Sequence, residues 1–479
     1  MPRKSIRKNY IYNLCYQFLI MVAPLITTPY VSRVLGAKGI GIVSYTDSVT
    51  SYFVLFATLG ITTYGQREIS YVQDNRESRT TVFWNTKCLQ FITSLISLVF
   101  FLMFAAFQDN KLLYIIYSIN IIAVFADITW LFQGMEEFQK IVLRNTFFKI
   151  INIAYIFIVI RSKYDVCLYA LGLCAFTLLG NISLWIYLPK YVDKIDLKKI
   201  HPFKELPVVL SLFIPTIAIQ IYTVLDKTMI GLITQNAFEN GYYEQAIKIS
   251  KMVLAIVTAL GTVMIPRIGF YFEKGELEEV KRLMYRGYRF VWFLGIPLCF
   301  GLITVSSNFV PWFYGEGFDK VVDLLRILAL LILAIGINNV TGMQYLIPTK
   351  RQNVFTLTVI IGACVNFVMN LILIRYFQSV GAALASVVAE AVIAVIQIFI
   401  VRKELNPFTI IKEGMHYYIA CIAMVTVLYF SGKILTPSII HTMSLVAVGA
   451  IAYFGALFAM KDEFFVSNVE KVLQKVRKK

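Results

Sequence analysis

The chain has 479 residues, of which 58% are hydrophobic and only 15% charged, and its mean hydropathy is +0.71. Soluble globular chains are about 45–50% apolar and about 25% charged, so this composition excludes a soluble protein. The 15% of aromatic residues excludes a disordered one. The net charge of +17 does not indicate nucleic-acid binding, because the basic residues lie in short loops between long apolar runs. We therefore expect an all-α polytopic membrane protein with no nucleic-acid partner.

The apolar runs predict fourteen membrane-spanning helices, since a span needs about 20 mostly apolar residues. In chain order they are 10–32, 39–64, 84–107, 112–133, 143–161, 166–188, 206–233, 241–265, 288–309, 321–346, 354–376, 380–401, 413–432 and 438–460. With the N-terminus inside, the inner loops and tails hold about 31 Lys and Arg and the outer loops about 8, a strong positive-inside bias. We therefore expect both termini in the cytoplasm.

The last segment, 461–479, has a different pattern from the spans. Its apolar residues fall roughly on one face, with lysines on the other; they are Phe464, Phe465, Val469, Val472, Leu473 and Val476. This pattern predicts an amphipathic helix on the inner leaflet. A solvated basic tail is the alternative.

An internal repeat organises the spans. A shift of 200 residues aligns Gly41 with Gly241 and Arg67 with Arg267, and a shift of 209 aligns Asn181 with Glu390. Helices 1–6 are thus predicted to repeat as helices 7–12 in the same orientation, which places a cavity between two lobes, as in secondary transporters. The expected parts are a lobe of 1–188, a cytoplasmic linker of 189–205, a lobe of 206–402, two helices in 403–460 and the tail 461–479.

Ionisable residues inside spans are costly and indicate function by default. Glu244, Lys248 and Lys251 follow i, i+4, i+7 spacing and so share one helix stripe. Two cations near the membrane midplane predict an anionic ligand such as a phosphate or an acidic sugar. An ion pair with Asp47 or Glu390 is the structural alternative.

Helices 1 and 2 supply the rest of the expected substrate cavity. Asp47, Ser48 and Ser51 form a polar wall at a similar depth, and Asn13 and Gln17 lie one turn apart on helix 1. Asp47 fits a salt-bridge partner of a cavity lysine as well as it fits a ligand.

Other residues fit gating or head-group capture. Pro24 and Pro215 interrupt the hydrogen-bond ladder of the first helix of each lobe, where a static kink is the alternative to a gate. The charged residues of this group are Arg33, Arg67, Arg144, Arg267, Asp226 and Lys227. Most such arginines snorkel or pair with lipid phosphates, but a ring of them could capture a pyrophosphate.

Two carboxylates are candidates for ion coupling. Glu390 near the midplane and Asp127 deeper toward the cytoplasm could carry H⁺ or bind Na⁺. The three histidines are far apart and show no metal-ligand spacing. No P-loop and no nucleophile–base–acid arrangement is present, so we expect neither an enzyme nor a cofactor.

The N-terminal stretch resembles a known family. Residues that carry the resemblance are Asn13, Pro24, Pro29, Tyr30, the run Ser32-Arg33-Val34-Leu35-Gly36, Gly39, Gly41, Tyr45 and Gly65 to Glu68, with "WLFQGMEEFQ" at 130–139 and "LDKTMIG" at 225–231. The family is the bacterial oligosaccharide (polysaccharide) flippases, the polysaccharide-transport branch of the MOP superfamily, which also contains MATE exporters and the lipid II flippase.

The resemblance implies a function. Members move undecaprenyl-pyrophosphate-linked oligosaccharides from the inner to the outer leaflet of the bacterial cytoplasmic membrane, for capsule or O-antigen-like polymers. The resemblance also implies contact with membrane lipids and coupling to H⁺ or Na⁺. A polymerase and glycosyltransferases of the same pathway are the implied partners. A monomer is expected, because both lobes are in one chain.

Two other readings stay open. A MATE-like H⁺- or Na⁺-coupled multidrug or cation antiporter would share the fold but would call for an acidic cavity. A non-transporting scaffold of a glycan-assembly complex would have no use for charges at the midplane.

Overall fold

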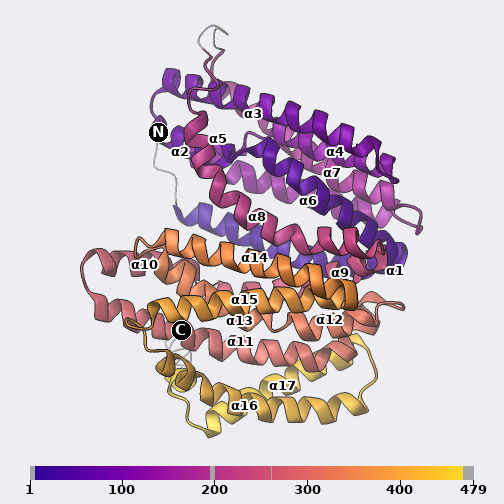
Figure 1. Cartoon of the computed structure of the whole chain (residues 1–479), viewed down its shortest axis with the longest axis vertical. Helices are drawn as coiled ribbons and strands as arrows, with labels where there is room; N and C mark the ends of the chain where they lie inside the picture. The colour runs from indigo at the N-terminus through magenta and orange to yellow at the C-terminus, as the bar shows by residue number, and fades with distance from the viewer. Residues whose placement is uncertain (1–5, 195–199, 260, 468–479) are drawn as a thin grey trace. The chain divides into compact units, whose positions relative to one another are not determined.

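The computed structural model describes residues 6–194, 200–259 and 261–467, and the regular elements in these ranges are all helices (Figure 1). The chain divides into two compact units. Unit 1 is Met1–Gly231 with Asn236–Gly241, and unit 2 is Leu232–Gln235 with Tyr242–Lys479. This division falls near the end of α8, whereas the predicted lobes rest on the repeat and meet at the linker 189–205. The lobe boundaries stay a prediction.

Unit 1 is built around its first helix. Its elements are α1 (Ile6–Thr58), α2 (Ile61–Tyr71), α3 (Arg76–Ala106), α4 (Lys111–Ala126), α5 (Thr129–Gly134), α6 (Phe138–Val159), α7 (Val166–Ser183), the 3-10 helix η1 (Leu184–Lys190) and most of α8 (Leu206–Thr234). The first helix packs against α3, α4, α6 and α7. Fully buried aromatic side chains, among them Phe101, Tyr117 and Trp130, fill the spaces between these helices.

Two helices meet within α1 at Gly36, whose φ of 67° and ψ of 175° are not helical. Only glycine adopts such a conformation without strain. This junction lies between the predicted spans 10–32 and 39–64. Pro24 and Pro29 lie inside the first of the two helices, where the backbone stays helical, so the interruption of α1 is at the glycine and not at a proline.

Small residues bring α1 and α9 (Ala237–Thr258) into backbone contact within unit 1. A Cβ on Gly41 would lie 1.6 Å from the carbonyl oxygen of Ala237, and one on Gly241 would lie 2.0 Å from that of Ala37. Each helix thus presents an Ala-x-x-x-Gly pattern, of the small-xxx-small kind that lets membrane helices approach closely. Gly41 contacts Ala237 and Gly241 contacts Ala37, so the contact is reciprocal between positions that are 200 residues apart. A repeat with an offset of 200 residues predicts this symmetry.

The segment after η1 is fastened to α3. Arg76 donates hydrogen bonds of 2.7 and 2.6 Å to the two carboxylate oxygens of Asp193, and the buried Arg79 donates one of 2.8 Å to the carbonyl of Tyr191. The hydrogen bond from Arg76 lowers the pKa of Asp193. The first residues of the predicted linker are therefore held against unit 1.

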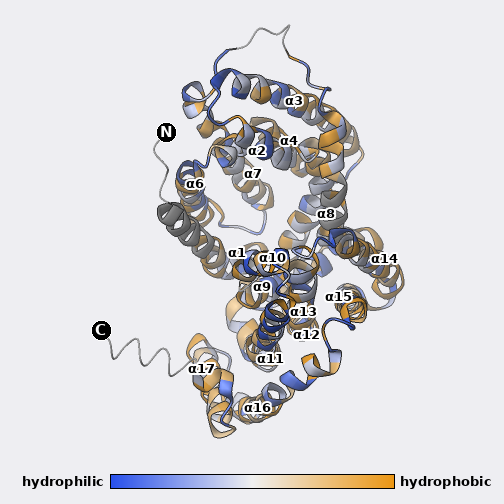
Figure 2. Ribbon diagram, turned by 90° about the vertical axis from the view of Figure 1, so that its left-hand side faces the viewer, coloured by the Kyte–Doolittle hydropathy of each residue, from blue (hydrophilic) through white to orange (hydrophobic). Residues whose placement is uncertain are grey.

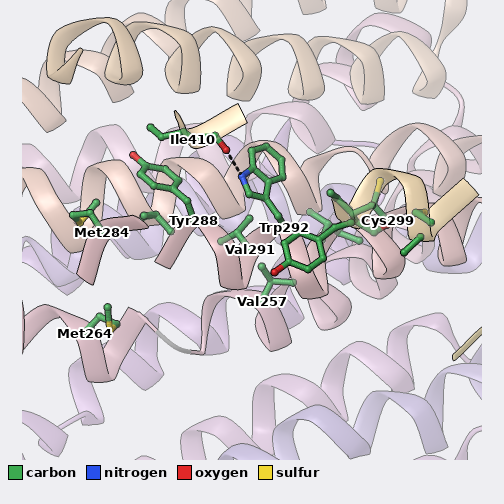
Figure 3. Close-up of a cluster of buried hydrophobic side chains, with 14 of the residues drawn as sticks. Val257, Met264, Met284, Tyr288, Val291, Trp292, Cys299 and Ile410 are labelled. Atoms are coloured by element: carbon green, nitrogen blue, oxygen red, sulfur yellow. Dashed lines mark hydrogen bonds between the residues drawn. The ribbon is translucent and has the colours of Figure 1, made fainter. Parts of the chain in front are cut away.

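Unit 2 is organised around a long helix, α11 (Leu277–Tyr314). Its other elements are most of α9, α10 (Gly261–Glu273), α12 (Lys320–Leu328), α13 (Leu331–Asn338), the π-helix η3 (Asn339–Leu346), α14 (Gln352–Phe377), α15 (Ser379–Val401), α16 (Pro407–Ile434) and α17 (Ile439–Ala459). The last two helices pack on α11. Trp292 of α11 lies in the core cluster of Figure 3, and its indole N–H donates to the carbonyl of Ile410, 2.9 Å away.

Several predicted spans are interrupted in the structure. The span 112–133 consists of α4 and α5 with a break at residues 127–128, and the span 321–346 consists of α12, α13 and η3. Within the described ranges, eleven helices are long and apolar enough to cross a membrane, or twelve if the bent pair α9–α10 forms one span. This count takes the helices joined at Gly36 together and leaves out α8, so the predicted number of fourteen is not confirmed.

The outward surface is that of a multi-pass membrane protein. Figure 2 colours α16 and α17 mainly as hydrophobic. Large side chains on them are strongly exposed, for example Ile422 at 66%, Ile440 at 72% and Ile451 at 72%. Apolar surface of this extent is stable in lipid and not in water, which confirms the predicted class of protein.

The contact of α1 with α9 leads to a prediction. Gly241→Ala places a methyl group against the carbonyl of Ala37 and should destabilise the folded protein by about 1–3 kcal/mol, as overpacking does. Gly432→Ala is the matched control, because a Cβ at that position of α16 meets nothing within 4 Å. Thermal unfolding in detergent micelles measures both. Equal unfolding midpoints for Gly241→Ala and Gly432→Ala would contradict the close contact between the backbones of α1 and α9.

Candidate functional site

A polar cavity lies inside unit 1, between α1, α3, α4, α6 and α7. It consists of two adjoining pockets of about 360 and 400 Å³. Both are lined by Asp47, Asn120, Thr177 and Asn181, so we treat them together as the unit 1 cavity. These four residues lie within helices that are apolar enough to span a membrane, and their position there makes the cavity a candidate site.

One stripe of α1 forms a wall of the cavity. Asp47, Ser51 and Thr58 line it and recur at spacings of four and seven residues, on one helix face. The Ser51 hydroxyl donates to the carbonyl of Asp47, 2.8 Å away. Ser48 is fully buried outside this lining, and its hydroxyl oxygen accepts a hydrogen bond of 3.1 Å from Thr228. Of the three residues predicted to form this wall, Asp47 and Ser51 therefore line the cavity, and Ser48 does not.

A cation lies on the opposite side, on α6. Arg144 donates to the side-chain oxygen of Asn145 at 2.9 and 2.6 Å and to that of Asn181 at 2.8 Å. Both of these acceptors are neutral amides, and they orient the guanidinium. Lys149, one turn further along α6, also lines the cavity.

The cavity extends to the break that follows α4. A helix end leaves its last four carbonyls without helical partners, and in a membrane each of them needs another donor. Four side chains donate to these carbonyls: Asn181 to Ala123, Gln90 to Val124, Lys87 to Phe125 and Trp185 to Ala126. The Val124 carbonyl also accepts from the backbone amide of Asp127 at 3.0 Å. Side chains of α3, α7 and η1 thus stabilise an interrupted helix.

Lys87 is the centre of this arrangement. It is only 3% exposed, and its ammonium group also donates to the carbonyl of Asp127 and to the side-chain oxygen of Gln90, each 3.1 Å away. A cation at the negative end of a helix dipole is favourable. The Asp127 carboxylate accepts from the amide of Thr129 at 2.8 Å, at the start of α5. Asp127, predicted for ion coupling, therefore also shapes the turn between α4 and α5.

The remaining lining is mostly neutral and polar. Amides and hydroxyls come from Gln90, Asn120, Asn145, Asn152, Asn181, Thr50, Ser51, Thr58, Thr62 and Thr177. The charged groups are two carboxylates, Asp47 and Asp127, and two cations, Arg144 and Lys149. Such a surface can exchange hydrogen bonds with a polyhydroxylated ligand, whose burial without partners would cost about 2–7 kcal/mol per group.

The predicted lysine pair lies in unit 2, on α9. Lys248 forms an ion pair with Glu244 one turn away, at 3.6 Å. Lys251 is exposed. Asp47 belongs to the other unit, so a site shared by Asp47 and the lysines stays a prediction.

Glu390 is buried in α15 and accepts a hydrogen bond of 2.5 Å from the side-chain amide of Asn338, on α13. The same amide also contacts the Glu390 carbonyl at 3.1 Å. The side-chain oxygen of Asn338 is buried without a hydrogen-bond partner in the described ranges. The role of this buried carboxylate in ion coupling stays a prediction.

Other predicted residues with described side chains are not part of the lining of the unit 1 cavity. Arg33 and Arg267 are exposed, and Arg67 forms an ion pair of 2.9 Å with Glu68. Asp226 is buried and Lys227 half-buried in α8. Pro24 is half-buried in α1. The side chains of Asn13, Gln17 and Pro215 lie outside the described residues, so their roles stay predictions.

The sequence analysis missed Lys87, Gln90, Asn120 and Thr177. Each is a polar or charged residue inside a predicted span, which is a signal in itself. Lys87 lies only three residues from the start of the predicted span 84–107, where a lysine is commonly taken to snorkel to the interface. The break in α4, which gives it a partner, is not visible in the apolar run.

Comparisons with known proteins agree with this architecture. The family model described as "Polysaccharide biosynthesis protein" matches residues 6–272. A "Putative O-antigen transporter" of Escherichia coli (strain K12) is 24% identical over 407 residues, which cover 84% of this chain and 97% of that protein.

Two solved structures share the fold. "Lipid II flippase MurJ, inward closed conformation" superposes with a TM-score of 0.75 at 16% identity, covering 95% of this chain and all of that one. A multidrug resistance MATE family transporter of the MOP superfamily, in its inward-facing conformation, gives 0.63 at 14% identity and covers 82% and 97%. At these identities the likeness shows the fold alone.

The side-chain donors to the carbonyls at the end of α4 lead to a prediction. Lys87→Met keeps the length of the side chain but leaves the carbonyls of Phe125 and Asp127 without this donor, at about 1–3 kcal/mol each. A lower unfolding midpoint is expected. Lys111→Met, at an exposed position at the start of α4, is the control and should leave the midpoint unchanged. If Lys87→Met has the same unfolding midpoint as the wild type, Lys87 does not stabilise the interruption between α4 and α5.

Proposed function

Because the chain belongs to the polysaccharide biosynthesis protein family and has the fold of the MOP transporters, we propose that it is a flippase without enzymatic activity. Its substrate would be an undecaprenyl-pyrophosphate-linked oligosaccharide, moved from the inner to the outer leaflet of the bacterial cytoplasmic membrane for surface polysaccharide biosynthesis. The family and fold predicted from the resemblance are confirmed by these likenesses. Substrate and direction are the proposal.

The unit 1 cavity carries this proposal. It places amide and hydroxyl groups within membrane-spanning helices, together with two cations and two carboxylates. Sugar hydroxyls need such partners to leave water, because each unpaired group costs several kcal/mol in hydrocarbon, of the order of 2–7. The head group would pass through the polar interior while the polyprenyl chain stays in the bilayer.

Arg144 is the best candidate for holding an anionic part of the substrate. Its guanidinium is fixed by Asn145 and Asn181, and arginine binds phosphate through paired, charge-assisted hydrogen bonds. Lys248 and Lys251 remain proposed contacts of unit 2, where the pairing of Lys248 with Glu244 at 3.6 Å weakens its attraction for a second anion. Alternating exposure of the cavity to the two sides would complete transport.

Energy coupling and partners belong to the same proposal. Buried Glu390, held by Asn338, is proposed as the site where H⁺ or Na⁺ couples to transport, and Asp127 as a second candidate. Both termini would lie in the cytoplasm, as the loop charges predict. The protein would act as a monomer and receive its substrate from glycosyltransferases of the same pathway, with a polymerase acting on the product.

A binding experiment tests the substrate class. Purified protein is heated with a polyprenyl-pyrophosphate glycan and, separately, with lipophilic cationic dyes. Stabilisation by the lipid-linked glycan alone is expected, because the cavity offers hydrogen bonds to hydroxyls and cations for the pyrophosphate. Stabilisation by the dyes alone would favour a MATE-like antiporter and contradict the flippase proposal.

Paired variants locate the site. Asn120→Ala/Thr177→Ala removes two hydrogen-bonding groups of the cavity and should weaken glycan binding about tenfold. Lys248→Ala/Lys251→Ala tests the contribution of unit 2. Lys163→Ala, in the loop between α6 and α7, is the control. Binding that survives the loss of Asn120 and Thr177 would place the sugar elsewhere and leave the substrate class standing.

A further inference from the structure

A second polar pocket, in unit 2, lies away from any residue assigned above. Its volume is about 610 Å³, and it is formed by α11, α16 and the segment 463–467 that follows α17. Three arginines, Arg282, Arg286 and Arg289, line it from α11. Their spacing of four and three residues puts them on one helix face. One wall of the pocket is therefore basic, and two carboxylates, Glu413 and the exposed Glu463, line it as well.

The sequence of α11 places this wall at the level of lipid head groups. Residues 290–314, which follow Arg289, contain no Asp, Glu, Lys or Arg. At 1.5 Å per residue they extend roughly 37 Å, enough to cross a hydrocarbon core of about 30 Å. Arg289 then lies at the edge of the hydrocarbon, and Arg286 and Arg282 lie one and two turns further out.

The charges of the pocket are not fully matched within the protein. Arg289 forms an ion pair of 3.1 Å with one carboxylate oxygen of Glu413. Arg282 pairs at 3.1 Å with Glu279, three residues earlier on α11. Arg286 is exposed and has no ion pair or hydrogen bond within the part of the chain that the structure describes. One guanidinium is thus available to an anion.

The same pocket contains an unused acceptor. The second carboxylate oxygen of Glu413 is buried and has no hydrogen-bond partner among the described residues. Buried polar atoms of this kind usually have a partner. A ligand that carries a hydroxyl group beside its phosphate would supply one.

The walls of the pocket are held in place by contacts of their own. The backbone amide of Asn406 donates to the Tyr285 hydroxyl at 2.9 Å, and Asp462 accepts from the amide of Phe465 at 2.8 Å. Phe464 packs edge-on to Phe293 of α11, with ring centroids 5.4 Å apart. The first residues of the predicted amphipathic tail therefore pack on the helices of unit 2, and residues 468–479 lie outside the described range.

We propose that this pocket binds the head group of an anionic phospholipid of the phosphatidylglycerol class. Arg286 and Arg282 take the phosphate, and a glycerol hydroxyl donates to the free oxygen of Glu413. Basic pockets between membrane helices at the cytoplasmic face bind phosphate head groups in this way. A choline head group has no hydroxyl to donate to Glu413, so the proposed site favours phosphatidylglycerol.

Lipid binding to the full-length protein tests the proposal. The detergent-purified chain is titrated with phosphatidylglycerol or phosphatidylcholine, and retained lipids are counted by native mass spectrometry beside thermal unfolding. Inorganic phosphate and pyrophosphate form separate arms. We expect phosphatidylglycerol to be retained and stabilising, and Arg286→Gln to weaken its binding about fivefold.

Arg402→Gln is the matched control, since Arg402 is an exposed arginine at the end of α15 that does not line the pocket; it should bind phosphatidylglycerol like the wild type. Equal retention by Arg286→Gln and wild type overturns the proposal. Equal stabilisation by free phosphate or pyrophosphate, with no advantage of the lipid, overturns the assignment to a phospholipid. An unchanged unfolding midpoint of lipid-free Arg286→Gln shows that the variant is folded.

Discussion

Unit 1 depends on one constraint, that no backbone carbonyl can be left without a donor inside a membrane. The break after α4 exposes four of them, and Lys87, Gln90, Asn181 and Trp185 each satisfy one. Gln90 and Asn181 also line the unit 1 cavity. The side chains that make the interrupted helix stable are thus partly the ones that give the cavity its polar surface, and structure and candidate function cannot be varied separately there.

The close crossing of α1 and α9 depends on the absence of side chains, whereas the break after α4 depends on side-chain donors. Gly41 and Gly241 allow the backbone of one helix to lie against that of the other, where van der Waals contact takes the role that the hydrophobic effect has in water. The pairing of Ala37 with Gly241 and of Ala237 with Gly41 joins equivalent positions of the predicted repeat. An internal duplication would produce such a reciprocal contact without further adjustment.

Much of the architecture could be predicted from composition and apolar runs, because lipid requires long uninterrupted apolar helices. The junction near Gly36 follows from the gap between two such runs. The break after Ala126 could not be predicted, since donors from distant helices make it stable and leave no local signal. Pro24 lies inside the first helix of α1, where the backbone stays helical, since neighbouring helices can accommodate a proline; its role in gating stays a prediction.

The candidate site shows why a charge in a span does not by itself identify a ligand contact. Lys87 donates to carbonyls at a helix end and serves the fold. Lys248 has a carboxylate one turn away, which offsets much of its field. Arg144 is oriented by neutral amides at the wall of a cavity. The sequence shows three similar cations, and Arg144 differs from the other two in lining the polar cavity where we propose that the substrate binds.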